Sequence, residues 1–238
     1  MTTNATAPAP SASATAARLS IAAIIAYQIP LLAVIFIRPE LDPSRKPISE
    51  FAIGRHGWVM QLAFLTAAVS YGALFVAVRP AVRGATGRVG LGILGVCVVG
   101  TVGVGVFVAD PVVTPLNELT TVGTLHVVYG LSALVLLPFA ALLINLDVAR
   151  GNTAAAPALR WTAGLPFVGL VLHWILSLAV PPEGWPPRVL FLTYAAWLVV
   201  LATQLLRVRG ARDRPDPHAP PRADSDRCGF TSRFKSSP

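Results

Sequence analysis

Four ionisable side chains lie inside apolar segments, at the end of one or in the loop before one, and their types suit proton transfer or metal binding. Asp110 directly follows one apolar run, and His126 lies near the start of the next. His173 lies in a later run, and Glu50 lies in the loop that precedes the second run. An ionisable group in lipid is energetically costly, so each one is a functional-site hypothesis. We therefore predict Asp110, His126, His173 and Glu50 as candidate catalytic residues.

The composition indicates an integral membrane protein. Of the 238 residues, 54% are hydrophobic and only 13% are charged, which is about half the charged fraction of a soluble domain. The two cysteines, Cys97 and Cys228, match no disulfide framework or zinc motif. The net charge of +8 comes mostly from residues that flank apolar runs. Membrane topology explains that charge more simply than nucleic-acid binding, so no nucleic-acid partner is predicted.

Six apolar runs are long enough to cross a bilayer as helices, because about 20 helical residues span the hydrocarbon core. They predict an all-α, polytopic membrane protein whose six-helix bundle occupies residues 18–206. The predicted spans cover residues 19–37, 57–78, 89–109, 122–146, 160–180 and 190–206. The remaining segments, 1–17 and 207–238, cannot build an apolar core and are predicted to be a disordered N-terminal tail and a disordered basic C-terminal tail.

Small residues mark the third and fourth predicted spans. The third contains six glycines, which would oppose a helix in water but let helices approach closely in lipid. Gly103 lies seven residues before Asp110 on the same face, where it removes bulk beside the neighbouring spans. One face of the fourth span carries His126, Tyr129, Gly130 and Ala133.

Basic residues predict the orientation of the spans. More of them flank the spans on the side that holds both termini than on the opposite side. Because basic residues favour the cytoplasmic side, we predict a multi-pass cell-membrane protein with both termini in the cytoplasm. The candidate residues then gather near the outer leaflet. We expect Asp110, His126 and His173 to surround one cavity there, with Glu50 or His56 folded over it.

Short motifs connect the chain to a known family. The segment ISEFAIGRHGW leads into the second span, Asp-Pro follows the third, and TLHVVYG opens the fourth. With these motifs, residues 19–206 resemble a bacterial six-helix membrane family, domain of unknown function 998. The likeness is carried by Ser49, Glu50, Asp110, His126 and Gly130. A more distant likeness is to the eukaryotic Frag1/DRAM group of six-span proteins, and neither resemblance implies a reaction.

Several functions are consistent with these residues. The sequence slightly favours a structural, sensor or partner-subunit role, in which His126 and His173 form hydrogen bonds across the bundle and Asp110 caps the fourth span or pairs with Arg55. The first alternative is a metal-free acid–base enzyme, a cyclase or isomerase acting on a lipid or isoprenoid. Such catalysis needs titratable groups in a partly dry site. Transport is the least supported, because the spans show no deep polar path or inverted repeat.

The remaining alternative is a metal-dependent lipid hydrolase. Zinc accepts histidine and carboxylate ligands, which His56, His126, His173 and Asp110 offer. This set is similar to that of the seven-span ceramidase and adiponectin-receptor hydrolases, although their HxxxH pair is absent here. Haem between His126 and His173 is a further possibility, whereas the favoured interpretation predicts no cofactor. Membrane lipids are the expected partners, together with a lipophilic small-molecule substrate if the protein is an enzyme.

Cysteine labelling from outside the cell tests the predicted orientation. A cysteine placed at Glu118, in the loop after the third span, should react with a membrane-impermeant reagent. A cysteine placed at Arg83, in the loop before that span, should stay unlabelled. The reverse labelling pattern would overturn the orientation.

Overall fold

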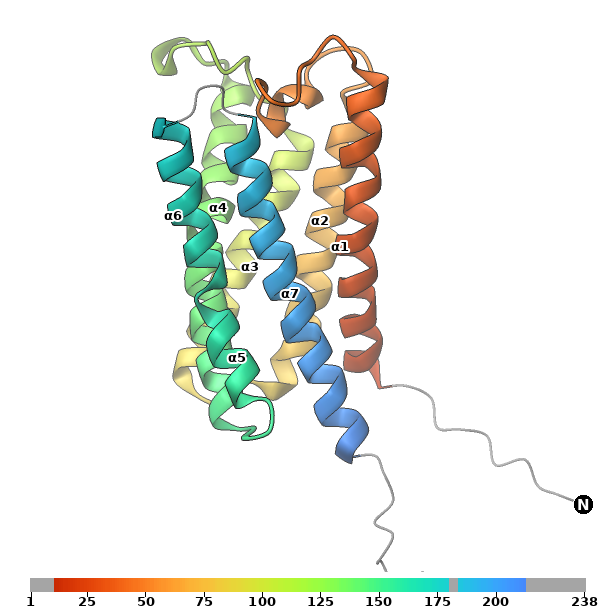
Figure 1. Cartoon of the computed structure of the whole chain (residues 1–238), viewed down its shortest axis with the longest axis vertical. Coiled ribbons are helices and arrows are strands. Elements are labelled where there is room, and N and C mark those ends of the chain that lie inside the picture. Colours follow the sequence, from red (N-terminus) through yellow and green to blue (C-terminus); the bar gives the residue numbers. More distant parts are fainter. Residues whose placement is uncertain (1–10, 180–183, 213–238) are drawn as a thin grey trace, which may run out of the picture.

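The structure is a computed structural model that describes residues 11–179 and 184–212. Every regular element in this part of the chain is helical, and six spans are long and apolar enough to cross a membrane. This confirms the predicted all-α, six-helix membrane fold (Figure 1).

The spans begin and end close to the predicted positions. They are α1 (Ala12–Ile37), α2 (Trp58–Val78), α3 (Ala85–Val106), α4 (Thr121–Arg150), α5 (Ala156–Ala163) with α6 (Leu165–Ala179), and α7 (Trp185–Arg212). Three short 3₁₀ helices lie between them: η1 (Ile48–Ala52), η2 (Arg79–Ala81) and η3 (Leu116–Glu118). Residues 12–17 and 207–212 are helical and extend α1 and α7 beyond the predicted spans. The rest of the two predicted tails, apart from Ser11, lies outside the described residues.

The fifth span differs from the continuous helix expected for residues 160–180. It consists of α5 and α6, which are separated at Gly164. Pro166 lies in the first turn of α6. The N–H groups of a first turn have no partner within the helix, so a proline there costs no helical hydrogen bond. Inside one continuous helix, the same ring would clash with the carbonyl four residues earlier. The chain ends α5 at Ala163, before the proline, and begins α6 at Leu165.

The six spans form a single bundle with two distinct ends. The start of α1 and the end of α7 lie at one end, which we call the terminal end; η1 and η3 lie at the other, the loop end (Figure 1). The helices α3 and α4 form the most extensive pair, α1 packs along α2, and α7 contacts both α1 and α6. The chain thus enters α1 and leaves α7 at the same end of the bundle, as six spans require, while the side that faces the cytoplasm stays a prediction.

Glycines in α3 let α4 approach closely. A Cβ atom at Gly90 would lie 3.0 Å from the Ile144 side chain, and one at Gly100 would lie 2.8 Å from the Tyr129 carbonyl. A Cβ at Gly103 would overlap the Tyr129 ring. Close packing of this kind drives helix association in lipid. The lipid tails are as apolar as the helices, so no hydrophobic effect brings the helices together there. The expected role of the glycines in the third span is therefore confirmed.

The substitution Gly103→Ala tests this packing. The new methyl group would overlap the Tyr129 ring, so we expect a loss of stability of about 1–3 kcal/mol and a lower melting temperature in detergent. Gly92→Ala is the matched control, because a Cβ there meets nothing within 4 Å. Equal effects of the two substitutions would contradict the role of Gly103.

Candidate functional site

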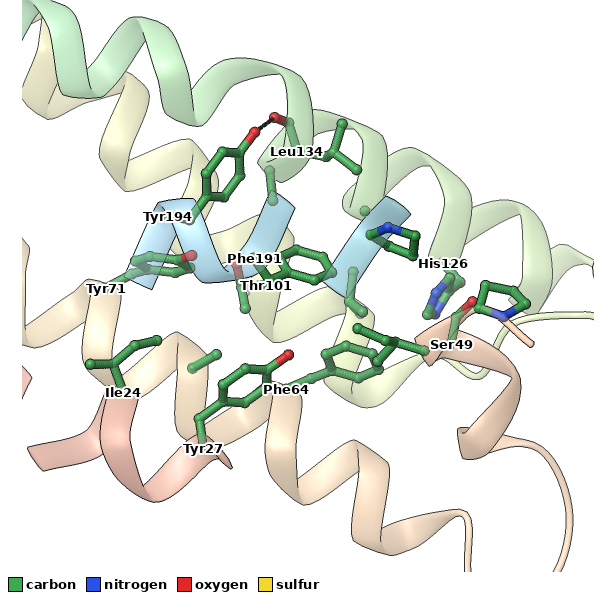
Figure 2. A pocket seen from close by; sticks show the side chains of 17 residues that line it. Ile24, Tyr27, Ser49, Phe64, Tyr71, Thr101, His126, Leu134, Phe191 and Tyr194 are labelled. Carbon is green, nitrogen blue, oxygen red and sulfur yellow. Dashed lines mark hydrogen bonds between the residues drawn. The ribbon is translucent and has the colours of Figure 1, made fainter. Parts of the chain in front are cut away.

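A cavity of about 190 Å³ lies inside the half of the bundle near the loop end. Helices α1, α2, α3, α4 and α7 surround it, and we call it the central cavity (Figure 2). Its walls are mostly apolar and include Ile24, Phe64, Val104, Leu134 and Phe191. Its polar wall residues are Tyr27, Ser49, Tyr71, Thr101, His126 and Tyr194.

His126 is the one residue of the four predicted candidates that lines this cavity. Its side chain is buried, and Nδ1 lies 2.7 Å from the carbonyl oxygen of Phe107, the residue that ends α3. Because a carbonyl only accepts, Nδ1 carries the proton, and the neutral ring leaves Nε2 as an acceptor. The ring also meets Phe64 edge to face, at 6.3 Å between centroids. These two contacts fix the imidazole and leave Nε2 as its acceptor for a ligand.

Asp110 caps α4 and does not line the cavity. Its carboxylate accepts hydrogen bonds from the Thr120 backbone N–H at 2.7 Å and the Thr120 hydroxyl at 3.0 Å. Thr120 is the N-cap of α4, and its hydroxyl accepts from the Gly123 N–H at 3.0 Å. A Cβ on Gly123 would overlap the Asp110 carboxylate. The negative charge thus sits at the positive end of the helix dipole and closes the hairpin between α3 and α4.

Glu50 joins two loops at the loop end. Its side chain is buried, and Oε1 accepts from the Val112 backbone N–H at 2.8 Å. Oε2 pairs with the Lys46 ammonium at 2.7 Å. A buried carboxylate without such partners would be costly. Glu50 therefore holds η1, whose residue Ser49 lines the cavity, against the loop after α3.

The same loop is also fixed to α7. Arg188 donates to the carbonyl oxygens of Lys46, at 3.2 Å, and Gly184. Its guanidinium lies over the Phe51 ring at 5.6 Å from the centroid, within the range of a cation–π contact. The loop between α1 and α2 is thus held on two sides above the central cavity.

The two other histidines among the described residues do not line the cavity. His173 is on α6, where its ring meets that of Trp174 at 5.6 Å between centroids. His56 is exposed in the turn before α2 and has a positive φ of 65°. The prediction that Asp110, His126 and His173 surround one cavity is therefore wrong. Equal depth in the membrane does not determine which face of the bundle a side chain occupies, and α6 packs mainly against α7.

The ligand set expected for zinc is not assembled in the part of the chain that the structure describes. No three His, Cys, Asp or Glu side chains there lie close enough to hold one metal ion. The sequence-based set of His56, His126, His173 and Asp110 is distributed over a turn, the cavity wall, α6 and a helix cap.

Three tyrosines of the cavity escape prediction from the sequence. Tyr27, Tyr71 and Tyr194 are buried and come from α1, α2 and α7. The Tyr194 hydroxyl donates to the Leu134 carbonyl at 2.6 Å. Within the described residues, the hydroxyls of Tyr27 and Tyr71 have no hydrogen-bond partner. The sequence feature that could have indicated them is their position along the spans. Tyrosines usually lie at the membrane interfaces, and a tyrosine in the middle of a span lies outside that belt.

Sequence comparison places this arrangement in a family. The family described as a protein of unknown function (DUF998) matches residues 20–204, from α1 to α7. The chain belongs to the DUF998 family. This confirms the resemblance read from the motifs, and His126 and Gly130 of those motifs line the central cavity of this DUF998 chain. No curated protein and no solved structure matches the chain, and the likeness to the Frag1/DRAM group stays a prediction.

Asp110→Ala tests whether this carboxylate caps α4. Two donors would lose their acceptor, so we expect a loss of about 1–3 kcal/mol in stability, seen as a lower melting temperature. Glu118→Ala is the control, because Glu118 is an exposed residue of the same hairpin. Asp110→Asn keeps one acceptor oxygen and should lose less than Asp110→Ala. An unchanged melting temperature for Asp110→Ala would contradict the capping role.

Proposed function

We propose that the protein binds a lipophilic small molecule in the central cavity and serves as a membrane sensor or partner subunit. The observation that carries this proposal is the cavity itself, a space of about 190 Å³ enclosed by five helices. Apolar walls with a few placed polar groups are the usual composition of small-molecule sites. Membrane lipids and isoprenoids are the lipophilic molecules that can reach such a cavity from the bilayer.

The wall chemistry favours a ligand with a neutral hydrogen-bonding group. Among the described residues that line the cavity, none is Lys, Arg, Asp or Glu, so a charged ligand group would be buried without a counter-ion. His126 offers Nε2 as an acceptor, and Tyr27 and Tyr71 offer hydroxyl groups. Figure 2 shows His126 and Ser49 toward one end of the cavity and Tyr71 and Tyr194 toward the other. A lipid or isoprenoid alcohol matches this pattern.

Acid–base catalysis on the same ligand is the second candidate. Nε2 of His126 can accept a proton from one ligand carbon, and a tyrosine hydroxyl can donate a proton to another. The imidazolium then returns a proton to the tyrosinate, which restores both groups. Such an exchange isomerises a double bond without a net change in atoms, and it needs an acid and a base in one partly dry site. Asp110 and Glu50 support this candidate less than the sequence suggested, because both carboxylates are engaged in helix-cap and loop contacts. A metal-dependent hydrolase lacks an assembled ligand set in the described residues.

Ligand retention tests the proposal. Protein purified in mild detergent should carry a lipophilic molecule with a hydroxyl group, identified by extraction and mass spectrometry. Ala133→Phe places a ring in the cavity that Ala133 lines, so this variant should lose the ligand. Ala196→Phe is the matched control, because Ala196 is exposed on α7 and the added ring should face lipid.

Two outcomes contradict ligand binding in the cavity. One is the absence of any lipophilic molecule above the detergent blank, and the other is equal retention by the Ala133→Phe and Ala196→Phe variants. His126→Gln separates the two candidate functions. For a sensor or subunit, the ligand extracted from this variant should have the same structure as that from the natural chain. For an isomerase, it should differ in the position of a double bond.

A further inference from the structure

A second cavity, of about 360 Å³, lies at the terminal end of the bundle, opposite the central cavity. We call it the terminal cavity. The start of α1, the loop after η2, the end of α4, α5 and the last turns of α7 surround it. Its polar lining residues are Ser11, Ser13, Arg83, Asn152, Gln204 and Arg209. Its apolar lining includes Val148, Leu159, Leu205 and Val208, so the cavity suits a molecule with both polar and apolar parts.

The terminal end carries an excess of positive charge. Its arginines in the described residues include Arg18, Arg79, Arg83, Arg88, Arg150, Arg160, Arg207 and Arg209. In the same part of the chain, Asp147 is the one carboxylate at this end. It is buried and accepts from the backbone N–H groups of Arg83, at 2.8 Å, and Gly84, at 3.0 Å. The ion pairs among described residues all lie between residues 38 and 50, at the loop end. The guanidinium groups of the terminal end thus have no carboxylate partner within the described residues.

Two arginines reach the terminal cavity from different elements. The Arg83 side chain lies beside Gly151, where a Cβ atom would be 3.9 Å from its Nε. Arg209, near the end of α7, donates to the Ser11 hydroxyl at 3.3 Å. Asn152, which also lines this cavity, accepts the Ala155 N–H through Oδ1 at 3.2 Å, which leaves its amide NH₂ as a donor. Guanidinium groups with nearby neutral donors form the usual binding set for phosphate.

We propose that the terminal cavity binds the head-group phosphate of an anionic phospholipid. The cavity lies where the apolar spans end, which is the level of the lipid head groups. Its two arginines can donate charge-assisted hydrogen bonds to the phosphate. Apolar contacts to the first part of an acyl chain can come from Val148, Leu205 and Val208. With both termini in the cytoplasm, this end meets the leaflet that is rich in anionic lipids. The site is separate from the central cavity and does not depend on the function proposed for it.

Lipid binding by the purified full-length chain tests the assignment. In detergent, phosphatidylglycerol should bind and raise the melting temperature, whereas phosphatidylcholine with the same acyl chains should bind about tenfold more weakly, since its ammonium group offsets the phosphate charge. Inorganic phosphate should not reproduce the effect, because it makes no acyl contact. Equal effects of the two lipids, or the same stabilisation by phosphate alone, would overturn the lipid assignment. These comparisons need no variant.

A pair of double variants locates the site. Arg83→Gln with Arg209→Gln removes both guanidinium groups of the cavity and should weaken phosphatidylglycerol binding about tenfold or more, because charge-assisted hydrogen bonds are lost. Arg150→Gln with Arg160→Gln removes the same charge from the same end, at exposed residues that do not line the cavity. This control should bind nearly as well as the natural chain. Equal weakening in both double variants would show diffuse attraction to the membrane surface and would overturn the site.

Discussion

The helices α3 and α4 are each capped by an aspartate from the end of the other, and the rest of the bundle depends on this reciprocal contact. Asp110 follows α3 and accepts from Thr120 at the start of α4. Asp147, near the end of α4, accepts from the backbone of Arg83 and Gly84 at the start of α3. The first N–H groups of a helix have no partner within the helix, and unsatisfied groups are especially costly near lipid. Each carboxylate also lies at a positive helix end, so both ends of the pair are fixed in register.

This register places the central cavity. With both ends held, the glycine face of α3 lies against α4, and Gly103 accommodates the Tyr129 ring. That ring stacks on Phe107 at 5.6 Å between centroids, and the Phe107 carbonyl receives the His126 Nδ1–H. The histidine thus satisfies a carbonyl that the end of α3 leaves without a partner. The structural contact uses Nδ1, and the ligand contact proposed above would use the other ring nitrogen, so the two are compatible.

The sequence predicts how deep a residue lies in the membrane far better than it predicts which way its side chain points around the bundle. Apolar length predicts the six spans, and the glycines predict the close approach of α3, because both depend on local residues. The direction in which the His173 side chain points depends on how α6 packs against α7. No local sequence pattern determines that packing. The sequence predicts Asp110 as a cap of the fourth span or as a partner of Arg55, and the structure shows the cap; its partner Thr120, ten residues away, lies across a turn whose geometry the sequence does not specify. Tyr27, Tyr71 and Tyr194 are not predicted as site residues, because they are uncharged hydrogen-bonding side chains in apolar spans and no motif in the sequence distinguishes them from packing residues.

The two ends of the bundle balance charge differently, and this difference explains why their cavities suit different molecules. At the loop end, Lys46 pairs with Glu50, and two further ion pairs lie within residues 38–45. The charged side chains of these pairs balance one another at that end. The central cavity next to them has described walls that carry no charge. At the terminal end, the described carboxylate of Asp147 is occupied by the backbone that opens α3. The arginines there have no carboxylate partner within the described residues, and this positive charge is what supports the phospholipid site proposed above. Within the described residues, the central cavity therefore has uncharged walls, whereas the terminal cavity is lined by Arg83 and Arg209.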